Sequence, residues 1–421
     1  MNRAQKAADA RKTVSRISQN RPIPLAKTSE SLFSPTILFV FMNTFAIMFQ
    51  FQVCVPTIAD YIEYLGVHRD FTGAFIALAS WGSALIQIVV FLILSCTSYK
   101  VAVAMLVTVM GVGNILYALA LPADSIALLL LGRLMMALTS GLQITMTGIN
   151  RALSDPGKEF DASRLNTIIY SLGGFLAYFA SAFTQETMVR STDVVVNDYN
   201  VVGFVSAAIC AVIVVFVVLK VPYNPVKKAK TRTNNSSASL YTLLLSWYMI
   251  YLFNYLEVMR QVSIFELWDK RWKHDSAINT NVGITMFAGV LFLGRLIIMV
   301  FDHYVLPKPR QQAVISALLC VSYIPLLPYD MPSTASILLQ GIFGIVFGFF
   351  VQNAFSYAVY LALEYVKISR YPQLILMITS IVMNLGFGTG STVSTLFDLS
   401  PVPASVGIVL VAIGTPLLLW S

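Results

Sequence analysis

Twelve apolar runs, each long enough to cross a membrane, constrain this chain more than any other feature. A spanning helix needs about twenty mainly apolar residues. Runs of that kind lie at 34–57, 71–95, 99–121, 124–149, 163–184, 200–221, 240–262, 279–302, 311–328, 334–362, 371–397 and 403–421. Only 11% of the residues are charged, too few to cover a water-soluble domain of this size. The sequence therefore predicts an all-α integral membrane protein with twelve transmembrane helices.

Lysine and arginine gather in alternate segments between these runs, as expected when those segments face the cytosol. This bias predicts that both termini are cytosolic and that residues 1–33 form a basic, disordered tail. The net charge of +8 is explained by topology, so no nucleic-acid partner is expected. The sequence does not decide between the plasma membrane and an endomembrane such as that of a lysosome or vacuole.

The middle of the chain predicts a division into two halves. Residues 222–239 are basic and rich in proline, serine and asparagine, typical of a cytosolic linker between a six-helix half at 34–221 and another at 240–421. The halves also resemble each other. Aligning similar apolar stretches pairs Gly82 with Gly294 and Gly132 with Gly341, at offsets of 212 and 209 residues. Two pseudo-symmetric six-helix halves are therefore expected.

This organisation resembles the major facilitator superfamily. LLLLGRLMMALTSG is similar to the family's fourth-helix pattern, and NRALSDPGKEFDASRLN to its loop between helices four and five. VCVPTIADYIEYLG and GNILYALA resemble a eukaryotic branch with lysosomal and SPX-tailed vacuolar members. The resemblance implies a monomeric secondary carrier of a small solute, working by alternating access with a proton as a possible coupling ion, with the solute site between the halves.

One signature of the family is degenerate. Between helices two and three the chain reads LSCTSYKVAV, with Lys100 and no acidic residue, whereas GRLIIMVFDHYVLPKPRQ after helix eight keeps Asp302, Lys308 and Arg310. We therefore expect the latter three to form the cytosolic gate. The weak first motif leaves an alternative, a facilitator-like sensor, receptor or ion-conducting pore without active transport.

Enzymatic activity is not expected. The chain has no phosphate-binding P-loop, no paired metal ligands and no GxSxG motif. No cofactor or metal is predicted.

Charged residues within the runs are the first candidates for function, because each costs free energy in lipid. Arg133 is predicted near the bilayer midplane, where it could attract an anionic solute or a proton-exchanging carboxylate, or bond structurally to backbone carbonyls. Glu257 could carry a proton, or pair with Arg260 at the outer end of helix seven. Arg295 is expected to extend toward the cytosolic end of helix eight as a structural residue.

Uncharged polar residues on the expected cavity helices complete the candidate site. They are Asn43, Gln50, Gln143, Asn254, Gln352, Asn353 and Tyr357. Such groups can bind a solute or bond helices to each other. The glycines from Gly386 to Gly390 favour close helix packing, with a flexible gate as the alternative.

Overall fold

The computed structural model describes residues 34–140, 159–187, 196–223, 239–267, 280–300, 333–369 and 371–396, with a few residues between 405 and 413. These ranges contain helices and no strand. The elements are α2 (Pro35–Val53), α3 (Ile58–Tyr64), η1 (Arg69–Phe71), α4 (Thr72–Cys96), α5 (Tyr99–Leu119), α6 (Ile126–Ser140), α8 (Glu159–Thr187), α9 (Val201–Lys220), α10 (Leu240–Leu267), α12 (Thr280–Val300), α14 (Ser333–Ile368) and α15 (Pro372–Leu396).

The all-helical prediction is confirmed for the described part of the chain. Six of its helices are long and apolar enough to cross a membrane, and α6, α12 and α14 contain shorter apolar stretches. Run 311–328 and most of run 403–421 lie outside the described residues, as do 1–33 and most of the predicted linker. Each of the other ten runs contains a long helix. The predicted total of twelve cannot be counted from the described helices.

Local signals explain where the first helix begins and how the chain turns after it. The Ser34 hydroxyl accepts a hydrogen bond from the Ile37 amide, with Pro35 at the first helical position. Beyond α2 the short helix α3 is fixed by Tyr61, whose hydroxyl donates to the Tyr117 carbonyl and accepts from the Leu121 amide. Burial raises the pKa of Tyr61, so this hydroxyl stays protonated.

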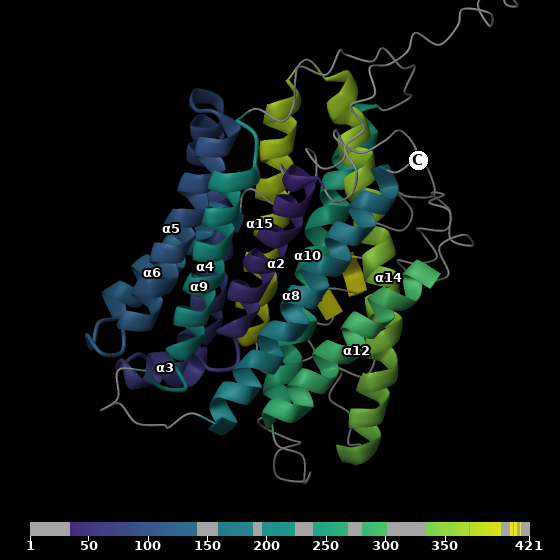
Figure 1. Ribbon diagram of the computed structural model, residues 1–421. Helices are drawn as coiled ribbons and strands as arrows, with labels where there is room; N and C mark the ends of the chain where they lie inside the picture. Colours follow the sequence, from purple (N-terminus) through teal and green to yellow (C-terminus); the bar gives the residue numbers. More distant parts are fainter. Residues whose placement is uncertain are drawn as a thin grey trace, which may run out of the picture.

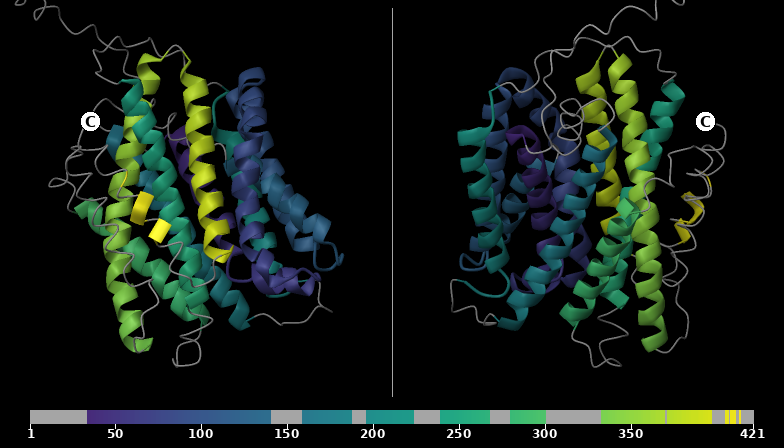
Figure 2. Two further views of the ribbon diagram at one scale, coloured as in Figure 1. Left: turned by 180° about the vertical axis from the view of Figure 1, so that it is seen from behind. Right: turned by 45° about the vertical axis from the view of Figure 1, so that its right-hand side comes forward.

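We call α2–α9 the N-terminal helices and α10–α15 the C-terminal helices. In Figure 1, α5, α6 and α9 lie to one side of α2, α10 and α15, and α12 and α14 lie to the other. The two groups touch along two seams, one between α4 and α15 and one between α8 and α12. Figure 2 shows the same order of helices from behind.

The two seams are equivalent under the sequence repeat. An offset of about 210 residues converts α4 into α12 and α8 into α15, so it exchanges one seam with the other. At the first seam the Trp81 indole donates to the Thr392 hydroxyl at 3.4 Å. At the second, the rings of Phe175 and Phe292 stack with centroids 5.7 Å apart. This exchange is what a pseudo-two-fold relation between the groups would produce.

The repeat-related glycines also face equivalent partners. A Cβ atom on Gly82 of α4 would touch Leu134 and Ala137 of α6, and one on Gly294 of α12 would meet the Ile345 backbone of α14. Both glycines therefore pack their helix against a helix of its own group, and the repeat offset relates these two partners, α6 and α14. For Gly341, aligned with Gly132, no atom of the described residues lies within 4 Å of the Cβ position.

The glycines from Gly386 to Gly390 lie in close helix contacts. Cβ atoms on Gly386 and Gly390 would meet the carbonyl oxygens of Tyr251 and Tyr255 on α10. One on Gly388 would lie 2.9 Å from the Trp81 ring. The packing interpretation therefore accounts for all three.

Candidate functional site

A buried chain of hydrogen bonds crosses from the N-terminal to the C-terminal helices where α2, α8, α10 and α12 meet. We call its six members the central network: Ser171 and Tyr178 of α8, Arg295 of α12, Glu257 and Gln261 of α10, and Gln52 of α2. Five of them are at most 7% exposed, and Gln261 is partly buried. Buried polar groups need partners, and here each finds one on another member of the network.

An ion pair lies at the core of this network. Arg295 Nη2 lies 2.5 Å from Glu257 Oε1, and Arg295 Nη1 donates to the Ser171 hydroxyl at 2.6 Å. Both charged side chains are less than 10% exposed. A bond of this kind in a low dielectric is strong once formed, because water does not compete for either partner.

Two sequence-based expectations are wrong here. Glu257 pairs with Arg295, whereas the Arg260 guanidinium donates to the Gln340 side chain at 3.1 Å and lies over the Phe347 ring. Arg295 is 4% exposed and bonds Glu257 and Ser171 instead of extending toward the C-terminal end of its helix, which was expected to be cytosolic. The reason is geometric, because helical side chains lean toward the helix N-terminus. In α12 that direction leads back toward the C-terminal part of α10, where Glu257 lies.

Two glutamines continue the network across the molecule. Gln52 Nε2 donates to Gln261 Oε1 at 2.7 Å, and Gln261 Nε2 donates to Glu257 Oε1 at 3.4 Å. The Tyr178 hydroxyl donates to Gln52 Oε1. Gln52 and Gln261 are 209 residues apart, which equals one of the repeat offsets. Equivalent residues meet each other only on a two-fold axis, so this pair marks where such an axis would pass.

Arg133 lies in a second buried site, formed by N-terminal helices. Its Nη1 lies 2.9 Å from the Cys54 sulfur, its Nη2 donates to the Ile76 carbonyl at 3.2 Å, and its guanidinium lies 5.9 Å from the Phe51 ring centroid. It is fully buried, and its Nε has no hydrogen-bond partner among the described residues.

Arg133 contacts residues near the ends of two neighbouring helices, and its position near the bilayer midplane stays a prediction. Its partners Cys54 and Ile76 lie at the C-terminal end of α2 and one turn into α4, so the guanidinium is level with helix ends. Close packing explains this placement. A Cβ on the preceding Gly132 would lie 2.7 Å from the Gly113 carbonyl oxygen, so α6 lies tightly against α5.

The remaining predicted residues do not join the central network through any described contact. Gln50 accepts a hydrogen bond from Asn114 at 2.9 Å and so joins α2 to α5. Asn254 donates to a carbonyl of its own helix, α10. Asn43 is fully buried and neither amide atom has a partner among the described residues, and Tyr357 is 6% exposed. Gln143, Asp302, Lys308 and Arg310 lie outside the described residues, as do the side chains of Gln352 and Asn353.

Lys100 has a partner that the sequence did not indicate. Its ammonium lies 4.9 Å from the centre of the Tyr223 ring, and its amide donates to the Tyr223 carbonyl at 3.3 Å. A cation–π contact thus joins the start of α5 to the segment after α9. The degenerate motif therefore makes a packing contact without an acidic partner in the described residues.

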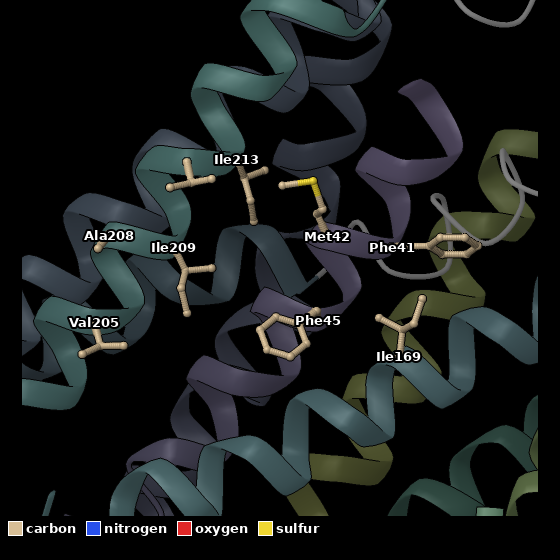
Figure 3. A pocket seen from close by; sticks show the side chains of 9 residues that line it. Phe41, Met42, Phe45, Ile169, Val205, Ala208, Ile209 and Ile213 are labelled. Carbon is tan, nitrogen blue, oxygen red and sulfur yellow. The ribbon is translucent and has the colours of Figure 1, made fainter. Parts of the chain in front are cut away.

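An apolar groove opens on the N-terminal helices, lined by none of the central network's members (Figure 3). It has a volume of about 550 Å³ and is formed by side chains of α2, α8 and α9: Phe41, Met42, Phe45, Ile169, Val205, Ala208, Ile209, Val212 and Ile213. Val212 is 62% exposed, so the groove lies at the surface of the bundle. It presents no hydrogen-bonding side chain to a polar solute, and we therefore place the candidate site at the central network.

Many solved structures are similar to this chain, and two of them are transporters that cover nearly all of it. The crystal structure of the human organic anion transporter MFSD10 (TETRAN) superimposes with a TM-score of 0.60 at 13% identity, over 91% of this chain and 99% of that one. A variant of the E. coli fucose:proton symporter FucP superimposes with a TM-score of 0.56 at 12% identity, over 90% and 99%.

No protein-family model matches the sequence, and no curated protein matches it. The likeness is thus one of architecture, covering nearly the whole chain. Together with the long apolar helices, it makes the chain a multi-pass integral membrane protein. The chain has the fold of the major facilitator transporters.

Proposed function

We propose that this protein is a secondary transporter that moves a small solute by alternating access between two six-helix halves, residues 34–221 and 240–421. The observation that carries the proposal is the central network, a buried set of charged and amide groups at the junction of the N-terminal and C-terminal helices. Polar groups in a membrane interior are costly and mark solute or ion pathways. The two similar transporters differ in solute, so the fold leaves the solute class open.

The contacts between the two groups of helices indicate which side is closed. Gln52 bonds Gln261 at the C-terminal end of α2, and the Phe51 and Phe387 rings lie 5.9 Å apart beside them. Trp81, in the first half of α4, bonds Thr392 near the end of α15. With a cytosolic N-terminus, all of these contacts lie toward the non-cytosolic ends of their helices. We infer that this conformation opens to the cytosol, and that these contacts break when the other side opens.

Glu257 is the group that we propose couples solute movement to a proton. It is the acidic member of the central network, and protonation would neutralise it and release Arg295 from the ion pair. A ligand can shift a conformational equilibrium only through differential affinity for the two states. Making and breaking this pair supplies such a difference, because Arg295 also donates to Ser171 of α8 and so joins the pair to the other group of helices.

The proposal is tested in proteoliposomes with a pH-sensitive dye inside and an imposed proton gradient. Sugars, amino acids, organic anions and inorganic phosphate are added in turn, and we expect at least one class to be accumulated together with protons. Glu257→Gln should abolish proton-driven accumulation while exchange of the same solute across the membrane continues. Gln87→Ala is the control, because Gln87 is buried but bonds only Ser83 of its own helix.

The second candidate is a sensor or an ion-conducting pore, which the degenerate motif at Lys100 favours. A current in voltage-clamped bilayers without added solute would show that the protein is a pore and not a carrier. Solute binding without solute flux would show that the protein is a sensor and not a carrier. Unchanged transport in both Arg133→Ala and Glu257→Gln would remove these two residues from the mechanism.

A further inference from the structure

Arg295 has an N–H donor without a hydrogen-bond partner among the described residues. A guanidinium offers five N–H donors in a planar fork suited to two oxygens of a carboxylate or phosphate. Arg295 donates from Nη1 to Ser171 and from Nη2 to Glu257, and its Nε has no hydrogen-bond partner among the described residues, although the residue is 4% exposed. A buried donor without a partner carries a desolvation cost that a ligand oxygen would remove.

The charge of Arg295 is balanced in the central network by Glu257. The charged residues that the described part of the chain buries are Arg133, Asp198, Glu257, Arg260 and Arg295. Asp198 lies just before α9, whereas Glu257 is the carboxylate that pairs with Arg295 in the central network. If Glu257 were neutralised or displaced, the site around Arg295 would carry an uncompensated positive charge.

We propose that the transported solute is a small anion whose carboxylate or phosphate oxygens bind the Arg295 guanidinium in competition with Glu257. This inference rests on the proposed transport function and adds the class of solute. Glu257 holds Nη2 of the guanidinium in the solute-free state, and Nε is the donor without a hydrogen-bond partner among the described residues. Gln261, bonded to both Glu257 and Gln52, supplies an amide that can follow the carboxylate when it moves.

Competition makes a prediction that a purely structural ion pair does not. When a protein group occupies a ligand's binding position, the apparent dissociation constant equals the intrinsic one divided by the fraction of time the position is free. Removing the charge of Glu257 while keeping its shape should therefore tighten anion binding. If Glu257 instead positioned the solute, the same change would weaken binding.

The test uses the purified full-length protein and matched pairs of probes, namely succinate with succinamide, lactate with lactamide, and inorganic phosphate alone. Binding is measured by calorimetry and by the shift of the melting temperature. We expect at least one anion to bind and its amide not to bind. Glu257→Gln should bind that anion at least about tenfold more tightly, and Glu257→Gln combined with Arg295→Gln should not bind it.

The double variant shows whether loss of binding comes from loss of the Arg295 guanidinium or from misfolding. It should fold, because the neutral pair leaves no unpaired charge buried. Failure of every anion to bind, equal binding of an anion and its amide, or weaker anion binding by Glu257→Gln would each overturn the anion assignment. Flux of a neutral solute in proteoliposomes would also overturn it while leaving the transport function intact. Anion binding of the expected kind without flux would preserve the site and contradict transport.

Discussion

Arg295→Ala is expected to abolish solute uptake and to lower the stability of the protein. The change leaves Glu257 buried without its cation, and breaking a buried ion pair from one side costs about 3–5 kcal/mol. It also removes the donor to Ser171 at the contact between α8 and α12. The two effects are measured by uptake into proteoliposomes and by thermal unfolding in detergent.

The double variant Glu257→Gln with Arg295→Gln separates these effects. Its melting temperature should return most of the way to that of the wild type, since no unpaired charge is buried, while uptake stays at background. Restored uptake in this variant would show that the pair serves the fold and not the solute. A single variant Arg295→Ala with normal uptake would exclude the central network from the transport path.

Gly113→Ala is expected to destabilise the N-terminal helices, whereas Gly174→Ala is not. A Cβ on Gly113 would lie 2.8 Å from the Gly132 carbonyl oxygen and 2.9 Å from the Met135 Cβ, so α5 and α6 would have to move apart. Overpacking of this kind costs about 1–3 kcal/mol. A Cβ on Gly174 would make only ordinary van der Waals contacts, with Met48 at 3.5 Å and Gln52 at 3.8 Å.

The comparison is informative because both changes improve helix propensity by a similar amount. Thermal unfolding should therefore show a lower melting temperature for Gly113→Ala and an equal or higher one for Gly174→Ala. Equal melting temperatures would mean that α5 and α6 are not in backbone contact at Gly113.

The fold could be predicted from the sequence because it depends on the lengths of the apolar runs and on an internal repeat, and both can be read from the sequence directly. Long apolar runs determine helices in lipid, and a repeat offset of about 210 residues relates the two seams. The alignment of Gly82 with Gly294 pairs two glycines that the structure places in equivalent helix contacts, with α6 and with α14. The eukaryotic branch, the orientation of the termini and the cytosolic gate stay predictions.

The candidate site could be predicted only in part. Charge in an apolar run identified Glu257 and Arg133, but partners on other helices depend on packing that the sequence does not display. The spacing of Glu257 and Arg260 suggested a pair within one helix, whereas the pair forms with Arg295 on α12. Gln261 was available to sequence reasoning, because it lies four residues after Glu257 and one repeat offset after Gln52.

Cross-linking the two central glutamines tests most directly whether the two groups of helices separate there during transport. Gln52→Cys and Gln261→Cys are combined in a chain whose native cysteines are replaced by alanine, and a short bis-methanethiosulfonate reagent joins the two thiols through reducible disulfides. Uptake should fall to background when the link forms and return on reduction, while the same treatment of a Gln87→Cys, Gln261→Cys chain has no effect. Full uptake with the Gln52–Gln261 link intact would contradict the account, because the contact would then never need to open.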